Sequence, residues 1–262
     1  MNEIDGWRTA LLDGAGFVLL KDLIPAAEAA TARELGLAAS TTEPPPTEPL
    51  PPHLLRKKAI GHQMVRGLLA RGQVFERLIQ HPVVVQLVQS ILGDDVTLNS
   101  YSVRILHPGA GEMGVHIDYP YWAMPGALPV RPPLMVQVIW MLQDFRQDNG
   151  ATVVAPGTQL LAARPDRALF AAKAQSVEGS AGSAIVSHGL LWHDTNPNRT
   201  NEPRVALLAN YGMKIIRPLD PNLADLPPEV LARATPLLRQ LIGLDLRQAV
   251  ARDLNRREMY GT

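Results

Sequence analysis

Residues 96–106 read VTLNSYSVRIL, a run rich in the β-branched and aromatic residues that favour strands. Four further runs share this character, and each lies close to glycine, proline or aspartate: 134–142 (LMVQVIWML), 151–155 (ATVVA), 183–187 (SAIVS) and 204–211 (RVALLANY). Several short strands separated by turn residues are typical of a β-sandwich or a β-barrel. The middle of the chain is therefore expected to form a sheet-rich core.

Helical patterns lie on both sides of this core. An alanine- and glutamate-rich stretch begins at Pro25 and runs to about Ala39, and residues 82–93 begin with proline and end with glycine. After the strands, Pro227-Pro228-Glu229 starts another helix, and residues 236–258 have an amphipathic pattern. Strand and helix do not alternate as a doubly wound sheet requires. The fold class predicted is mainly β with flanking helices.

The order of these segments favours a single domain over residues 1–262. Its N-terminal helices lie in 1–93, its β core in 94–216 and a C-terminal helical extension in 217–262. The C-terminal helices are expected to pack on the domain or to join copies of the chain into a homo-oligomer. Residues 43–52 (EPPPTEPLPP) cannot form a helix or an inner strand, because each proline lacks an N–H donor and restricts its predecessor. Both a lid and a passive surface loop fit this segment.

Composition excludes several classes of protein and of site. Lys and Arg number 25 and Asp and Glu also number 25, so the net charge is zero, which argues against binding to nucleic acid or a membrane surface. Cysteine is absent, which excludes disulfides, iron–sulfur clusters, thiolate zinc sites and cysteine nucleophiles. The acidic N-terminus MNEIDGW does not resemble a signal peptide, and the longest apolar run is too short to span a bilayer. We therefore expect a cytoplasmic protein whose metal, if any, is held by His, Asp or Glu.

A histidine and a carboxylate lie two residues apart in the stretch GVHIDYPYW, residues 114–122. Alternate residues of a strand point to the same face, so an imidazole nitrogen of His116 and a carboxylate oxygen of Asp118 would converge. This pair is two-thirds of a facial site of two histidines and one carboxylate, which leaves three positions of an octahedral iron open.

A third ligand and a cation follow about 75 residues later, in HDTNPNRTNEPR, residues 193–204. His193 would complete the triad, and Arg204 would lie at the start of the next strand. A metal can chelate the 2-oxo carboxylate end of an α-keto dicarboxylate, while a guanidinium forms a bidentate salt bridge to the far carboxylate. The hydroxyl of Thr195 could donate to that same carboxylate.

These pieces together resemble the phytanoyl-CoA dioxygenase family of non-haem iron(II)- and 2-oxoglutarate-dependent oxygenases, which includes ectoine hydroxylase. The H-x-D pair is followed by Trp122, and DNGATVVAPGTQ at 148–159 is similar to the family's "eNGpl.viPGSH". The H-x-T-x-x-N-x-T-x-x-x-R pattern of 193–204 is close to the family's distal motif, and GAGFVL at 14–19 is similar to its opening "dGfvvl". The resemblance covers roughly residues 6–214, with Gln159 where the family often has histidine.

The resemblance implies a double-stranded β-helix, or cupin-like jelly roll, with iron at its open end. His116, Asp118 and His193 would bind Fe(II), Arg204 and Thr195 would bind 2-oxoglutarate, and Gln137 would be a weaker contact. The substrate contacts expected are Trp122, Tyr121 and Arg104, although Arg104 could instead pair with a carboxylate. The implied reaction uses O2 to hydroxylate an unactivated C–H bond of a small-molecule metabolite, in a biosynthetic pathway, with release of succinate and CO2. Desaturation and cyclisation stay open.

Other readings of the same residues have to be weighed. His188 could be the distal ligand, but only His193 has Asn198, Thr200 and Arg204 at the family's offsets. A zinc-dependent hydrolase would use the same triad with a bound water, but it would leave Arg204 unexplained. A non-catalytic jelly-roll binding protein would be expected to have lost at least one ligand, whereas all three are present.

Overall fold

The strands of this protein form two antiparallel sheets. The computed structural model describes residues 2–41, 60–118, 121–218, 220, 223 and 226–244. Within them the larger sheet has the strand order β1 (Phe17–Leu20), β7 (Ala184–His188), β4 (Met135–Met141), β9 (Arg204–Gly212), β3 (Thr97–Leu106) and β2 (His62–Val65). The smaller sheet has the order β6 (Gln175–Val177), β5 (Thr152–Val154) and β8 (His193–Thr195).

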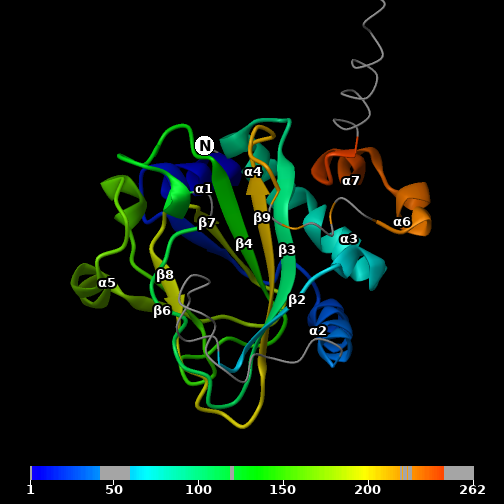
Figure 1. Ribbon diagram of the computed structural model, residues 1–262, viewed down its shortest axis with the longest axis horizontal. Coiled ribbons are helices and arrows are strands. Elements are labelled where there is room, and N and C mark those ends of the chain that lie inside the picture. The colour runs from blue at the N-terminus through cyan, green and yellow to red at the C-terminus, as the bar shows by residue number, and fades with distance from the viewer. Residues whose placement is uncertain are drawn as a thin grey trace, which may run out of the picture.

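An apolar cluster lies between the two sheets. It combines residues of the larger sheet with residues of the smaller sheet and the loops that join them: Ile139, Met141, Phe145, Ala151, Val154, Val177, Ile185, Leu191 and Ala206. The smaller sheet and helix α5 (Arg167–Lys173) lie on one side of the larger sheet (Figure 1). Two facing antiparallel sheets are the arrangement that a jelly roll requires.

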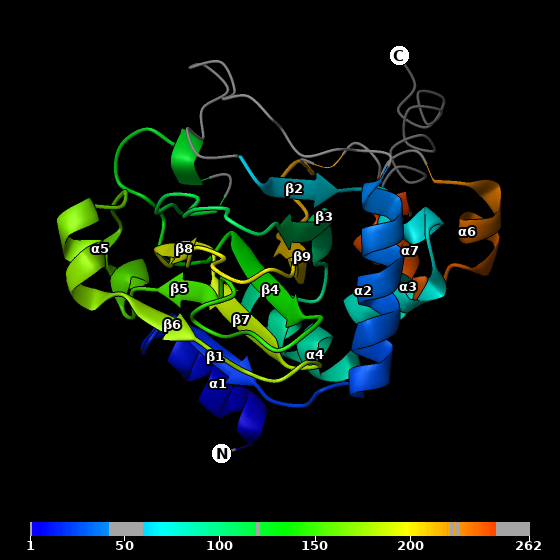
Figure 2. The same cartoon turned by 90° about the horizontal axis from the view of Figure 1, so that it is seen from below.

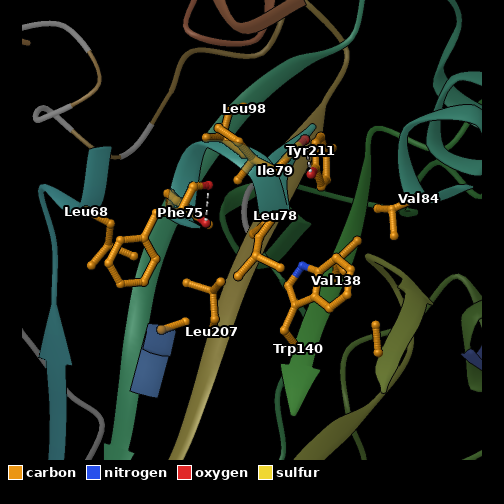
Figure 3. Packing of buried hydrophobic residues seen from close by; sticks show 14 of the residues in the cluster. Leu68, Phe75, Leu78, Ile79, Val84, Leu98, Val138, Trp140, Leu207 and Tyr211 are labelled. Atoms are coloured by element: carbon orange, nitrogen blue, oxygen red, sulfur yellow. Dashed lines mark hydrogen bonds between the residues drawn. The ribbon is translucent and has the colours of Figure 1, made fainter. Parts of the chain in front are cut away.

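The other face of the larger sheet is covered by the N-terminal helices, as Figure 2 shows. These helices are α1 (Glu3–Leu12), α2 (Ala26–Ser40), α3 (Gln73–Ile79) and α4 (Pro82–Leu92). In the packed interface, Leu78 of α3 lies beside Leu207 and Trp140 of the sheet, and Ile79 lies near Leu98 and Tyr211 (Figure 3). The Tyr211 hydroxyl donates to the Ile79 carbonyl at 2.8 Å, which ties α3 to β9. The N-terminal helices therefore pack on one face of the larger sheet, and its other face points toward the smaller sheet.

Local sequence explains the central elements. Every residue of β4 is buried, because helices cover one face and the smaller sheet covers the other. This double burial accounts for the apolar run MVQVIWM, which only Gln137 interrupts. Helix α4 has Pro82 in its first turn and ends at Gly93, whose φ of +91° is in a region that favours glycine. Gly36 lets α2 approach β3, since a Cβ there would lie 3.0 Å from Val103.

The structure agrees with most of the predicted elements. Strands β3, β4, β5, β7 and β9 and helices α2 and α4 match predicted segments to within one residue at each end. The short strands β2, β6 and β8, helix α5 and the 3-10 helices η2 (Leu68–Ala70), η3 (Tyr121–Ala123) and η4 (Thr158–Leu161) were not predicted.

The C-terminal segment differs from the expectation. Helix α6 (Pro228–Arg233) begins where the double proline predicts, but α7 (Pro236–Leu241) is shorter than the amphipathic pattern of 236–258. The helix ends before Gly243, whose φ is +68°. Residues 245–262 lie outside the described residues, as does the proline-rich segment 43–52. In the described part of the chain, no helix has the length and apolar character needed to cross a bilayer.

Candidate metal centre

His116, Asp118 and His193 lie together beside strand β8 of the smaller sheet. One ligand atom from each lies within 4.8 Å of the others. Nε2 of His193 is 3.9 Å from Oδ1 of Asp118, and the two imidazole ring centroids are 4.2 Å apart. His116 and His193 form an antiparallel β-bridge, with N–H···O distances of 3.0 and 3.1 Å between their backbones. The backbone therefore brings the proximal and distal motifs into direct contact.

The hydrogen bonds of the two histidines favour metal binding. Nδ1 of His116 lies 2.9 Å from the Gly114 carbonyl, and Nδ1 of His193 lies 2.9 Å from the Leu191 carbonyl. A carbonyl only accepts, so each Nδ1 carries the proton and each Nε2 presents its lone pair. Two neutral imidazoles and one carboxylate are the ligand set of a facial iron(II) site. The side chains present therefore fit such an ion.

Gln137 on β4 supports the carboxylate ligand. Its Nε2 donates to Oδ1 of Asp118 at 3.0 Å, and both side chains are buried. The contact of Gln137 with the cosubstrate stays a prediction. What the structure shows is the hydrogen bond from its amide to Asp118. Since the N–H group must face the carboxylate, the amide oxygen faces away from Asp118. Gln137 thus fixes the orientation of Asp118.

Arg204 is a buried cation at the first position of β9. Its side chain is 6% exposed, and one N–H group donates to Oγ1 of Thr195 at 2.8 Å. Its guanidinium lies 4.8 Å from the ring centroid of Phe145. Burial lowers the pKa of Arg204 to about 10, so it remains charged at neutral pH. Among the described residues no carboxylate forms an ion pair with it, and its buried Nε has no hydrogen-bond partner. A buried cation of this kind is suited to binding an anion.

Thr195 links this arginine to the metal-binding strand. It lies two residues after His193 on β8, so both side chains point to the same face. Its hydroxyl accepts from Arg204 and donates to the Gly150 carbonyl at 2.8 Å. The hydroxyl proton that was expected to be donated to 2-oxoglutarate is therefore donated to the Gly150 carbonyl in this structure. Direct donation to 2-oxoglutarate stays a prediction, whereas orientation of Arg204 by Thr195 is observed.

The three residues predicted to contact the substrate lie in different surroundings. Tyr121 is fully buried, and its hydroxyl accepts the Leu134 N–H at 2.7 Å, while burial raises its pKa to about 12. The side chain of Trp122 lies outside the described residues. Arg104 is half-buried on β3, where it pairs with Ala206, so it shares a sheet face with Arg204. All three contacts stay predictions.

His188 is not part of the cluster of ligand atoms. Its Nδ1 accepts the Leu190 N–H at 3.0 Å, and its ring stacks on Tyr121 with 6.4 Å between centroids. Burial, together with the positive charge of Arg131, lowers the pKa of His188 to about 4. The geometry therefore gives this residue a structural place beside the site.

The depressed pKa of His188 predicts a pH dependence of stability. An unfolded histidine has a pKa near 6.5, so between about pH 4 and 6.5 the unfolded chain binds more protons than the folded one. The contribution is fully present above pH 6.5 and is lost, by about 3 kcal/mol in all, as the pH falls toward 4. Asparagine at this position keeps an acceptor for the Leu190 N–H but does not titrate. Denaturant unfolding of the wild type and His188→Asn across this range should show a flatter profile for the variant.

Sequence reasoning missed two features around the site. Asp194 lies between the ligand His193 and Thr195, and its carboxylate accepts backbone N–H groups of Met113, Gly114 and Thr195. Gln159, which departs from the resembled pattern, is fully buried and donates to the Gly14 carbonyl at 2.9 Å. No local sequence pattern predicts the contact of Asp194 with Met113 or that of Gln159 with Gly14, because these residues are about 80 and 145 positions apart.

The chain matches a family model described as Phytanoyl-CoA dioxygenase (PhyH) over residues 12–206. It is 33% identical over 171 residues to "Dioxygenase af480" of Aspergillus fumigatus, a match that covers 64% of this chain and 54% of that protein. It is 27% identical over 193 residues to "Dioxygenase olcK" of Penicillium canescens, covering 72% of this chain and 62% of that one. The match thus spans between half and two-thirds of the length of these relatives.

Two solved structures have a similar fold. One is the epimerase SnoN in complex with Fe3+, alpha ketoglutarate and nogalamycin RO, with 18% identity, a TM-score of 0.66 and coverage of 89% of this chain and 92% of that one. The other is the carbocyclase SnoK from nogalamycin biosynthesis, with 16% identity, a TM-score of 0.64 and coverage of 87% and 92%. These likenesses confirm the predicted cupin-like jelly roll.

Proposed function

This chain belongs to the phytanoyl-CoA dioxygenase family, and from that premise we propose that it is an iron(II)- and 2-oxoglutarate-dependent dioxygenase. The reaction proposed is hydroxylation of an unactivated C–H bond of a small-molecule metabolite in a biosynthetic pathway. The observation that carries the proposal is the buried Arg204, which has no acidic partner among the described residues and is joined through Thr195 to the strand of His193. A hydrolase using the same triad has no need of this cation.

Each residue of the centre has a separate task. Nε2 of His116, Nε2 of His193 and the Asp118 carboxylate would hold iron(II). The bound iron would supply the redox chemistry by which O2 oxidises 2-oxoglutarate to succinate and CO2 and delivers its other oxygen atom to the substrate. Arg204 would bind the distal carboxylate of 2-oxoglutarate as an ion pair. Gln137 holds Asp118, and the apolar cluster between the sheets, whose Phe145 contacts Arg204, would keep water from the guanidinium.

The finer assignments belong to the same proposal. Trp122, Tyr121 and Arg104 are proposed to contact the substrate. Residues 1–262 are proposed to be one catalytic domain, located in the cytoplasm, with its C-terminal helices available for self-association. The shared sheet face of Arg104 and Arg204 supports the choice of Arg104.

The test is formation of succinate from 2-oxoglutarate by purified protein with Fe(II), ascorbate and air. We expect slow turnover without substrate, because this family of reactions can oxidise the cosubstrate alone, and we expect none under nitrogen. Replacing Fe(II) by Zn(II) should abolish succinate formation, since zinc has no redox chemistry. Protein that binds iron but neither binds nor turns over 2-oxoglutarate would contradict the proposal and leave the hydrolase or binding-protein reading.

A further inference from the structure

Asp194 is a buried carboxylate in contact with the backbone that carries a metal ligand. It is 9% exposed, and it lies on β8 between His193 and Thr195, whose side chains point to the opposite face. Its Oδ1 accepts the N–H groups of Met113 at 3.0 Å and Gly114 at 2.9 Å, and its Oδ2 accepts that of Gly114 at 3.1 Å. Its Oδ1 also accepts the N–H of Thr195 at 2.8 Å. The carboxylate thus joins the distal strand to the proximal segment.

The segment that Asp194 holds cannot be rigid through its own sequence. Residues 109–114 read GAGEMG, so glycine occupies three of six positions, and glycine loses more conformational freedom on folding than any other residue. Gly114 has a φ of +101°, in a region that other residues rarely adopt. Its carbonyl accepts from Nδ1 of His116 at 2.9 Å, and this hydrogen bond fixes which ring nitrogen faces the metal.

We propose that Asp194 is a positioning residue for His116. Its carboxylate holds the Met113–Gly114 backbone so that the Gly114 carbonyl can orient the His116 ring and keep the proton on Nδ1. The inference rests on the proposed metal centre, in which Asp194 itself is not a ligand. It predicts that loss of Asp194 impairs His116 and leaves His193 largely intact, because Nδ1 of His193 is bound by the Leu191 carbonyl instead.

The proposal is tested with Asp194→Asn in the full chain. Asparagine has the same size, but it is neutral, and its NH2 group replaces the Oδ2 acceptor that faces the Gly114 N–H. We expect the affinity for Co(II) to fall about 10-fold, the lower end of the range for losing a direct partner of a ligand, because Asp194 supports the Gly114 carbonyl and not His116 itself. In the metal-free protein, long-range 1H–15N NMR of the imidazoles should show mixed tautomers for His116 and one tautomer for His193. A role in stability alone would change neither the tautomer nor the visible spectrum of bound Co(II).

A second variant changes the backbone at the Gly114 carbonyl and leaves Asp194 in place. An added Cβ on Gly114 would meet no atom within 4 Å, so Gly114→Ala acts only through the positive φ. We expect the same tautomer mixture at His116 and a similar loss of Co(II) affinity. The double variant should lose less than the product of the two single effects, because both act on one peptide. Asp144→Asn is the control, since it removes another carboxylate that accepts a backbone N–H, that of Ala181.

The outcomes separate this inference from the proposed function. Wild-type protein that binds no Co(II) would overturn the metal centre, yet the tautomer of His116 would still report on Asp194. Wild-type affinity and a single His116 tautomer in both Asp194→Asn and Gly114→Ala would overturn the positioning role. If Asp194→Asn does not fold, wild-type Co(II) affinity and a single His116 tautomer in Gly114→Ala would still overturn the proposal, because the carbonyl that Asp194 is proposed to hold would then not orient His116.

Discussion

Replacing Asp118 by alanine is expected to abolish both tight metal binding and succinate formation. Asp118 is the one negatively charged ligand of the cluster, it is 7% exposed, and its removal leaves two neutral imidazoles. It also leaves the Gln137 amide without its acceptor at 3.0 Å. The loss of metal affinity should therefore exceed the roughly 10–100-fold that follows loss of a supporting partner. Titration of the apo protein with Co(II), followed by the succinate assay with Fe(II), measures both effects.

The control for Asp118 is a carboxylate of similar burial far from the site. Asp220 is 3% exposed and lies among residues around η2 on the helix-covered side of the sheet. Asp220→Asn should lower thermal stability and leave the Co(II) affinity unchanged. Asp118→Asn keeps the shape of the ligand but removes its charge, so it should bind Co(II) more weakly than the wild type. Unchanged metal affinity in Asp118→Ala would show that the cluster is not the iron site.

Two of the three proposed metal ligands could be brought together from the sequence because their pattern is local. His116 and Asp118 are two residues apart, and the spacing alone places both side chains on one face if the backbone is extended. The structure brings them within reach of His193 through a β-bridge between His116 and His193. That bridge joins residues 77 positions apart, so no local spacing links the two motifs. The sequence offers His193 as a third ligand, and the resemblance to a known family favours it over His188.

The supporting residues could not be predicted because their partners are set by topology. Thr195 was expected to donate its hydroxyl proton to the cosubstrate, and in the structure that proton goes to the Gly150 carbonyl, which is distant in sequence. Gln137 was expected at the cosubstrate, whereas the pairing of β4 with its neighbours brings its N–H to Asp118. Strand β8 is three residues long, too short for an alternating pattern to show.

Replacing Arg204 by alanine is expected to raise the 2-oxoglutarate requirement by about 100-fold, in line with the 2–5 kcal/mol lost when one partner of a buried charge pair is removed. The metal ligands are untouched, so Co(II) affinity should stay within about threefold of the wild type. Arg204→Lys should recover only part of the loss, because an ammonium cannot form the bidentate pair of a guanidinium. Binding of 2-oxoglutarate to Mn(II)-loaded protein without oxygen measures the effect apart from turnover.

A stability measurement separates this role from a purely structural one. In the ligand-free protein Arg204 is a buried charge that has no acidic partner among the described residues, and removing such a charge costs little or stabilises the fold. Arg204→Met, which fills similar space, should therefore keep or raise the melting temperature of the ligand-free protein. In the wild type, 2-oxoglutarate should raise the melting temperature with increasing concentration, as a ligand of the native state does, and in Arg204→Met this rise should disappear. The opposite result would be a variant that is strongly destabilised and still binds 2-oxoglutarate normally. Arg204 would then be a structural residue that acts only through its hydrogen bond to Thr195 and its contact with Phe145.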